Sequence, residues 1–143
     1  MKSKLLVFTQ FFIIFLMVIP FGEPVVFKFF GLGIIAFGAL IGSFALYKNR
    51  LGNFNIRPDI KVDGKLITTG IYSYIRHPMY SSVLVTMGGV VVLYPMEYEY
   101  VLYALLVVTL LIKLHYEESL WKCESLEYQE YCKSSKKIIP MIY

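Results

Sequence analysis

Four long apolar segments, separated by polar or proline-containing stretches, are the feature that most restricts the fold of this chain. They run over residues 5–21, 25–47, 79–94 and 98–114. A helix of roughly 20 apolar residues crosses the hydrocarbon core of a bilayer and bonds all its backbone groups internally. Because 57% of the 143 residues are hydrophobic, the chain is too apolar for a soluble domain. The pattern predicts an all-α, polytopic membrane protein.

We expect a single integral membrane domain over residues 1–143, with about four transmembrane helices. A polar linker at 48–78 separates two pairs of segments, and a polar tail occupies 115–143. The first segment has an alternative interpretation as a signal peptide. We interpret it as a retained span, because the sequence Pro20-Phe21-Gly22-Glu23-Pro24 stands at its end in place of a small-residue cleavage site.

The distribution of basic residues predicts the orientation of these spans. Two lysines precede the first segment, six Lys or Arg residues lie in the linker and five lie near or in the tail. The two short turns, at 21–24 and 95–99, hold none and contain three glutamates. Since Lys and Arg accumulate on the cytoplasmic side, we expect the linker and both termini to be cytoplasmic.

A polar stretch from Gly70 to Tyr80 lies where the linker meets the third apolar segment. Arg76 and His77 stand directly before Pro78, with tyrosines on either side. We expect Pro78 in the first turn of a helix, where its missing N–H is harmless. The free N–H groups of such a turn favour anions, so this stretch is a candidate ligand site.

A second polar cluster, at residues 113–120, follows the fourth apolar segment. Lys113 and Glu117 are four residues apart and share a helical face. Ionisable groups at a membrane boundary usually face protein or a cavity, although a solvated helix end is the alternative. A tight turn at 95–99 makes the last two spans antiparallel neighbours. We therefore expect residues 76–78 to lie beside residues 113–118.

Two further patterns concern packing and thiols. Gly38 and Gly42 have the small-xxx-small spacing of a close helix contact, or simply reflect how common glycine is in membrane helices. Cys123 and Cys132 have no CxxC spacing and no histidine at ligand spacing. We interpret them as reduced structural thiols on a cytosolic segment and predict no metal site.

Several motifs, taken together in order and spacing, resemble the isoprenylcysteine carboxyl methyltransferase family over roughly residues 53–140. They are Leu66-Ile67-Thr68-Thr69-Gly70-Ile71-Tyr72, Arg76-His77-Pro78-Met79-Tyr80, Glu117-Glu118-Ser119-Leu120, Tyr128-x-x-Tyr131 and Ile139-Pro140. The resemblance implies a multi-span membrane enzyme that uses S-adenosylmethionine in a cytosolic pocket. It also implies a lipophilic or prenylated acceptor, such as an isoprenylcysteine carboxylate. The expected partners are this acceptor and the lipid bilayer, and no nucleic acid.

The resemblance also implies roles for individual residues. The implied cofactor contacts are Gly64, Lys65, Leu66, Ile67, Tyr72, His77, Pro78, Met79, Tyr80 and Glu117. Arg76 and Lys113 are the implied catalytic cations, at the level of the acceptor's reacting head group. Lys113 stands where the family commonly has an arginine.

Two alternatives remain open on the sequence. The Arg-His-Pro-x-Tyr element and the tail from Tyr131 to Tyr143 also resemble sterol reductases, which use NADPH. A small non-enzymatic membrane scaffold would instead use the tyrosines as interfacial belts and Arg76 as a topology charge. Binding of adenosylhomocysteine, of NADPH or of neither separates the three.

Overall fold

The computed structural model describes residues 2–19, 22–23, 28–53, 55–59 and 64–143, with only the backbone at 51 and 52. Over these residues the chain forms five α-helices, one short 3₁₀-helix and no β-strand. The helices are α1 (Lys2–Val18), α2 (Lys28–Asn53), α3 (Pro78–Leu93), α4 (Glu97–Glu124) and α5 (Leu126–Ser134), and the 3₁₀-helix η1 spans Gly70–Ser73. The predicted all-α fold is therefore confirmed for the described part of the chain.

The apolar segments and the helices do not end at the same residues. The predicted limits at 20–21 and 25–27 lie outside the described residues. Helix α2 continues past the predicted segment end at 47, with a break in helical geometry at Arg50, whose φ is 55°. Helix α4 continues past Leu114 to Glu124. The start of the predicted linker and the start of the predicted tail are therefore helical.

The continuation of α4 has a local cause. Residues 115–124 lose apolar character but keep helix-forming side chains. Glu118 and Lys122, four residues apart, pair at 3.4 Å. The helix ends at Ser125, which is extended and whose Oγ accepts the N–H of Tyr128 at 3.1 Å, so that it caps α5. The tail, predicted only as polar, thus contains a helix of its own.

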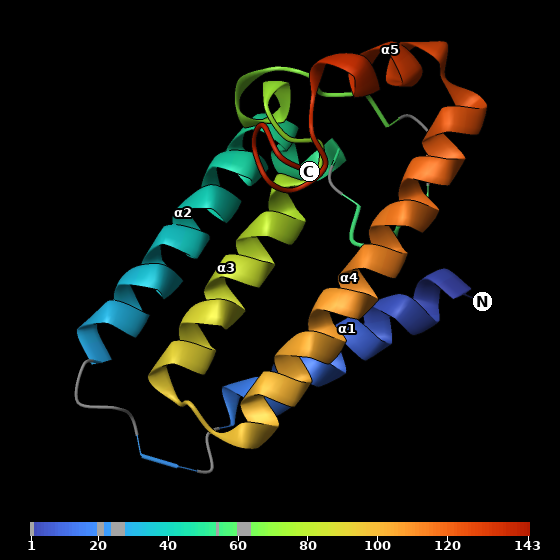
Figure 1. Cartoon of the computed structure of the whole chain (residues 1–143). Coiled ribbons are helices and arrows are strands. Elements are labelled where there is room, and N and C mark those ends of the chain that lie inside the picture. The colour runs from blue at the N-terminus through green and yellow to red at the C-terminus, as the bar shows by residue number, and fades with distance from the viewer. Residues whose placement is uncertain (1, 20–21, 24–27, 54, 60–63) are drawn as a thin grey trace.

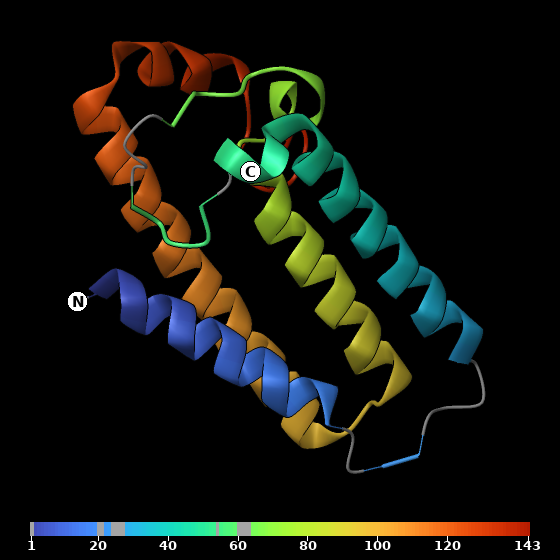
Figure 2. The same cartoon turned by 180° about the vertical axis from the view of Figure 1, so that it is seen from behind.

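Figures 1 and 2 show how the helices pair. Helices α2 and α3 lie side by side, and α1 crosses α4. Helix α5 leads from the end of α4 back over the end of the molecule where α2 finishes and α3 begins (Figure 1). The linker and the C-terminal segment lie at this same end, so the polar segments gather there.

Small residues bring α2 and α3 into close contact. A Cβ added at Gly38 would lie 2.7 Å from the backbone nitrogen of Thr86, and one added at Gly42 would lie 2.6 Å from Oγ of Ser82. Ser82 Oγ also donates a hydrogen bond of 2.8 Å to the carbonyl oxygen of Gly38. Larger side chains have no room here, so the small-xxx-small interpretation is confirmed.

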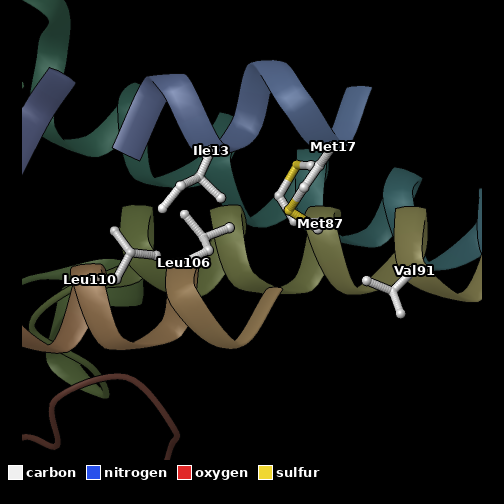
Figure 3. Close-up of a cluster of buried hydrophobic side chains, with 6 residues drawn as sticks. All are labelled: Ile13, Met17, Met87, Val91, Leu106 and Leu110. Carbon is white, nitrogen blue, oxygen red and sulfur yellow. The ribbon is translucent and has the colours of Figure 1, made fainter. Parts of the chain in front are cut away.

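A small apolar core forms where α1, α3 and α4 meet (Figure 3). It consists of Ile13 and Met17 from α1, Met87 and Val91 from α3, and Leu106 and Leu110 from α4. Helix α1 points residues 3, 10, 13 and 17 inward, at helical spacing. Its inner stripe is therefore apolar toward one end and polar toward the other.

The outer helix faces carry large apolar side chains. On α4, Val101, Leu105, Val108 and Ile112 are each at least half exposed. On α1 and α2 the exposed residues include eight phenylalanines, namely Phe8, Phe11, Phe12, Phe15, Phe29, Phe30, Phe37 and Phe44. Such a surface is unfavourable in water and ordinary in lipid. Residues 28–50 of α2 and the whole of α4 are long and apolar enough to cross a membrane, whereas α1 has 17 residues and α3 has 16.

Candidate active site

The polar stretch from Gly70 to Tyr80 folds into the 3₁₀-helix η1 and then into the first turn of α3. Gly70 begins η1 with φ of 67°, in the left-handed region that glycine adopts without strain. Pro78 is in the first turn of α3, as predicted, and His77 precedes the helix as its N-cap. The His77 carbonyl oxygen accepts the N–H of Tyr80 at 3.0 Å. The N–H of Met79 lies in the same first turn, where the helix offers no carbonyl oxygen to accept it.

The C-terminal segment is hydrogen-bonded alongside this stretch. The Arg76 N–H donates to the Lys136 carbonyl at 2.8 Å, and the His77 N–H donates to the Lys137 carbonyl at 2.9 Å. Ile75 and Lys136 form an isolated parallel bridge. A distant part of the chain therefore fixes the backbone of Arg76 and His77 as an extended strand partner would.

Arg76 is tied to α4 and to the tail. Its Nε lies 2.8 Å from Glu118 Oε1, and the two side chains are 6% and 4% exposed. Its Nη1 donates to the carbonyl of Ser135 and, at 3.4 Å, to that of Cys132. Burial lowers the pKa of Arg76, but the hydrogen bond and charge of Glu118 outweigh it and raise the pKa above its ordinary value. The predicted proximity of residues 76–78 to 113–118 is thus confirmed.

His77, Tyr80 and Glu117 form a further contact between the start of α3 and α4. Tyr80 donates its hydroxyl hydrogen to Glu117 Oε2 at 2.6 Å. The His77 ring stacks on the Tyr80 ring, with centroids 5.2 Å apart and planes 3° apart. His77 Nε2 is buried and has no hydrogen-bond partner among the described residues, and Glu118 Oε1 is 3.5 Å away. Nε2 therefore faces the Glu118 carboxylate, while the stacked His77 and Tyr80 rings both line the pocket and are candidate ligand contacts.

Lys113 lies close to this group but is turned toward α1. Its Nζ donates to Gln10 Oε1 at 2.8 Å and stands 5.2 Å from the centroid of the Tyr80 ring. The residue is only 2% exposed. Tyr80 therefore contacts a cation through its ring and a carboxylate through its hydroxyl.

A pocket lies between the linker, the start of α3 and the end of α4. It is open on one side, and about 820 Å³ of space between and in front of its lining atoms is empty, open solvent included. Its lining includes all ten residues expected to contact a cofactor, namely Gly64, Lys65, Leu66, Ile67, Tyr72, His77, Pro78, Met79, Tyr80 and Glu117. Arg76 also lines the pocket, whereas Lys113 does not. Segments distant in sequence thus meet around one space.

The pocket is also lined by residues that were not among the expected cofactor contacts. These are Asn49, Asn53, Asn55, Asp59, Trp121, Tyr128 and Tyr131. Asn53 is held in place by the linker, because its side chain exchanges two hydrogen bonds with the backbone of Lys65, at 2.7 and 2.8 Å. The asparagines near the end of α2 are a signal in the sequence that could have pointed to this part of the pocket.

Three tyrosines give the pocket an aromatic wall. Tyr128 stacks on Trp121, with centroids 5.6 Å apart, and meets Tyr131 edge to face at 6.0 Å. Burial raises the pKa of Tyr72 to about 12 and that of Tyr131 to about 12, and it raises the pKa of Tyr128 further. These phenols are therefore neutral at physiological pH, and the wall presents ring faces without added negative charge.

Comparison with known proteins identifies one family. The sequence model of the isoprenylcysteine carboxyl methyltransferase (ICMT) family matches residues 31–122, which is more than half of the chain. No curated protein and no solved structure gives a significant match. The match includes α3, most of α4 and the linker, which hold most of the pocket-lining residues. The chain therefore belongs to the isoprenylcysteine carboxyl methyltransferase family and is a membrane methyltransferase.

Proposed function

We propose that this protein transfers a methyl group from S-adenosylmethionine to a lipophilic acceptor, such as an isoprenylcysteine carboxylate. The observation that carries the proposal is the pocket in which the Gly64–Ile67 segment, the start of α3 and Glu117 come together. The family match supports methyl transfer, and the pocket supports the choice of donor.

The residues of the pocket fit the chemical groups of this cofactor. Its amino-acid part is a zwitterion. The carboxylate suits the N–H of Met79 and the imidazole of His77, since both residues line the pocket. The amino group or the ribose suits Glu117, whose side chain is 26% exposed and keeps Oε1 free of any hydrogen bond to the described residues. Aromatic faces, such as those of Tyr72 and Tyr80, attract a sulfonium cation.

When bound, the cofactor supplies an electrophilic methyl group. The protein's own contribution is then alignment and the exclusion of water. An acceptor that is already an anion needs no general base, so positioned charges and a dry site matter more than proton transfer. The ties between the tail and Arg76 support such a site, because they keep the start of α3 fixed beside α4.

We propose different roles for the two cations. Arg76 would act by holding Glu118 and the C-terminal segment, since at least three of its contacts go to them. Lys113 would act on the acceptor. It uses one donor on Gln10, and an ammonium has three. An anionic head group beside Tyr80 would then meet a positive charge next to the cofactor pocket.

We further propose one domain of four transmembrane helices, with the pocket, the linker and both termini on the cytoplasmic side. The basic residues of the N-terminus, linker and tail support this orientation. The gathering of the polar segments at one end of the helices supports it as well (Figure 1). Reporter fusions after residues 23, 60 and 143 test it, and an external reporter at either of the last two positions would contradict it.

Calorimetry on the purified protein in detergent tests the cofactor. We expect adenosylhomocysteine to bind and NADPH not to bind. A screen with labelled S-adenosylmethionine over a farnesylated cysteine analogue and lipid amines then tests the acceptor. Binding of NADPH alone would favour a reductase, and binding of neither compound would remove the proposed activity.

A further inference from the structure

Helix α1 contributes a buried polar side chain at an apolar position. Gln10 is 6% exposed and sits on the inner stripe of α1, one helical turn from the apolar core residue Ile13. Its Oε1 accepts the Lys113 ammonium at 2.8 Å. The family match begins at residue 31, so α1 lies outside it.

The hydrogen-bond acceptor of the Lys113 ammonium, the Gln10 amide, carries no charge. A buried ammonium is costly unless a counter-charge compensates it. In the described part of the chain, Lys113 forms no ion pair; its contacts are the Gln10 amide and the face of the Tyr80 ring. The Glu117 carboxylate, one helical turn along α4, attracts the ammonium without contacting it and is itself bound by the Tyr80 hydroxyl. The amide orients the ammonium without neutralising it. The other two donors of the ammonium have no acceptor among the described residues, so they remain for an anion that reaches Lys113.

The surroundings indicate where such an anion would come from. Val108 and Ile112, just before Lys113 on α4, are more than half exposed, as is Phe11 of α1. A lipophilic molecule can lie along these faces within the bilayer while its polar head reaches the level of Lys113. Tyr80, which Lys113 contacts, lines the pocket and bonds Glu117. An anion held there would be next to the proposed cofactor site.

We propose that Gln10 is a specificity-determining residue for the acceptor, which selects an anionic head group by holding Lys113 in place without placing a counter-charge against it. The inference rests on the proposed methyl transfer. It assigns the selection of an anionic acceptor to the contact between Gln10 of α1 and Lys113 of α4. Gln10 acts through Lys113, so it is a positioning residue.

The isosteric variant Gln10→Glu separates this role from simple packing. It keeps the size of the side chain and an oxygen beside Lys113, but it adds a negative charge that neutralises the ammonium. A structural role predicts that this variant behaves like the wild type. The proposed role predicts the loss of anionic acceptors only. Gln129→Glu is the matched control, because Gln129 is exposed on α5 and the change in net charge is the same.

The probes are a farnesylated cysteine analogue with a free carboxylate and the carboxamide of the same compound. Their binding to the purified protein in detergent is measured by calorimetry without cofactor, and their methylation is measured separately. For Gln10→Glu we expect carboxylate binding to weaken by about tenfold or more, the loss of one charged contact. Binding of the carboxamide and of adenosylhomocysteine should stay within about twofold. Gln129→Glu should change none of them.

A second variant, Gln10→Leu, removes the anchor of Lys113 without neutralising it and should lose less carboxylate affinity than Gln10→Glu. The reverse order would overturn the proposal, as would an equal loss of both probes or wild-type carboxylate affinity in Gln10→Glu. If the wild type binds adenosylhomocysteine but neither probe, the inference fails and the cofactor assignment stands. If it binds the carboxylate in the expected pattern but not adenosylhomocysteine, the proposed function fails and the anion site stands.

Discussion

Replacing Gly38 by alanine tests how α2 and α3 are held together. The added Cβ would lie 2.3 Å from Thr86 Oγ1, 2.7 Å from the Thr86 nitrogen and 3.0 Å from its Cα. The hydroxyl can rotate away, but the two backbone atoms cannot. The helices must therefore move apart locally. This strains the hydrogen bond of 2.8 Å between Ser82 Oγ and the Gly38 carbonyl.

Two opposing effects set the size of the change. Alanine in place of glycine favours a helix by up to about 1 kcal/mol. Overpacking a close contact costs about 1–3 kcal/mol, and a weakened buried hydrogen bond adds about 0.5–1.5 kcal/mol. Gly33 isolates the first effect, because a Cβ added there meets no atom within 4 Å. We expect Gly33→Ala to be neutral or stabilising and Gly38→Ala to be less stable than it by about 1.5–4.5 kcal/mol.

The measurement is denaturant unfolding in detergent, followed by circular dichroism and by the fluorescence of Trp121, the single tryptophan. Helix α2 also carries Asn49 and Asn53 into the pocket, so ligand affinity should fall along with stability in Gly38→Ala. The double variant with Thr86→Ala should recover only part of the loss, since the backbone contacts remain. Equal stability of Gly38→Ala and Gly33→Ala would refute this account of the α2–α3 contact.

Three further predictions concern the site. His77→Ala and Glu117→Ala should each weaken adenosylhomocysteine binding about tenfold or more, which is the value of one hydrogen bond to a charged group. The control Glu130→Ala, on the exposed face of α5, should leave binding unchanged. If calorimetry shows unchanged binding in both site variants, the pocket is misassigned. Lys113→Ala should lower turnover of a farnesylated cysteine carboxylate without changing adenosylhomocysteine affinity, whereas Lys113→Arg should keep activity. If Lys113→Ala instead gains turnover of a lipid amine, the acceptor is cationic. Because folding raises the pKa of Tyr72 from 10 to about 12, its protonated form contributes stability that is complete below pH 10 and is lost as the pH rises toward 12. Between pH 9 and pH 11 the free energy of unfolding should therefore fall less in Tyr72→Phe than in the wild type. An equal fall in both proteins would contradict this.

Local signals in the sequence were sufficient for the start of α3. Proline fixes its own φ, glycine allows the left-handed turn at Gly70, and both effects depend on a single residue. The closeness of Arg76 to Glu118 could be predicted from topology, because a short turn at 95–99 makes the two helices that it joins antiparallel neighbours. These features could be predicted since each needs only sequence-local chemistry or chain connectivity.

Features that depend on the surroundings of a helix could not be predicted in this way. Gln10 stands in an apolar segment, and nothing near it in sequence distinguishes an amide facing lipid from one that faces a lysine about a hundred positions away. Its partner is decided by how α1 crosses α4, which the apolar pattern leaves open, because α1 is apolar on nearly every side. In a membrane, an apolar stripe no longer identifies the buried face of a helix, since lipid accepts apolar side chains as well as protein does. Small or polar residues carry that information instead: Gly38 marks the face of α2 that meets α3, and Gln10 marks the face of α1 that meets α4.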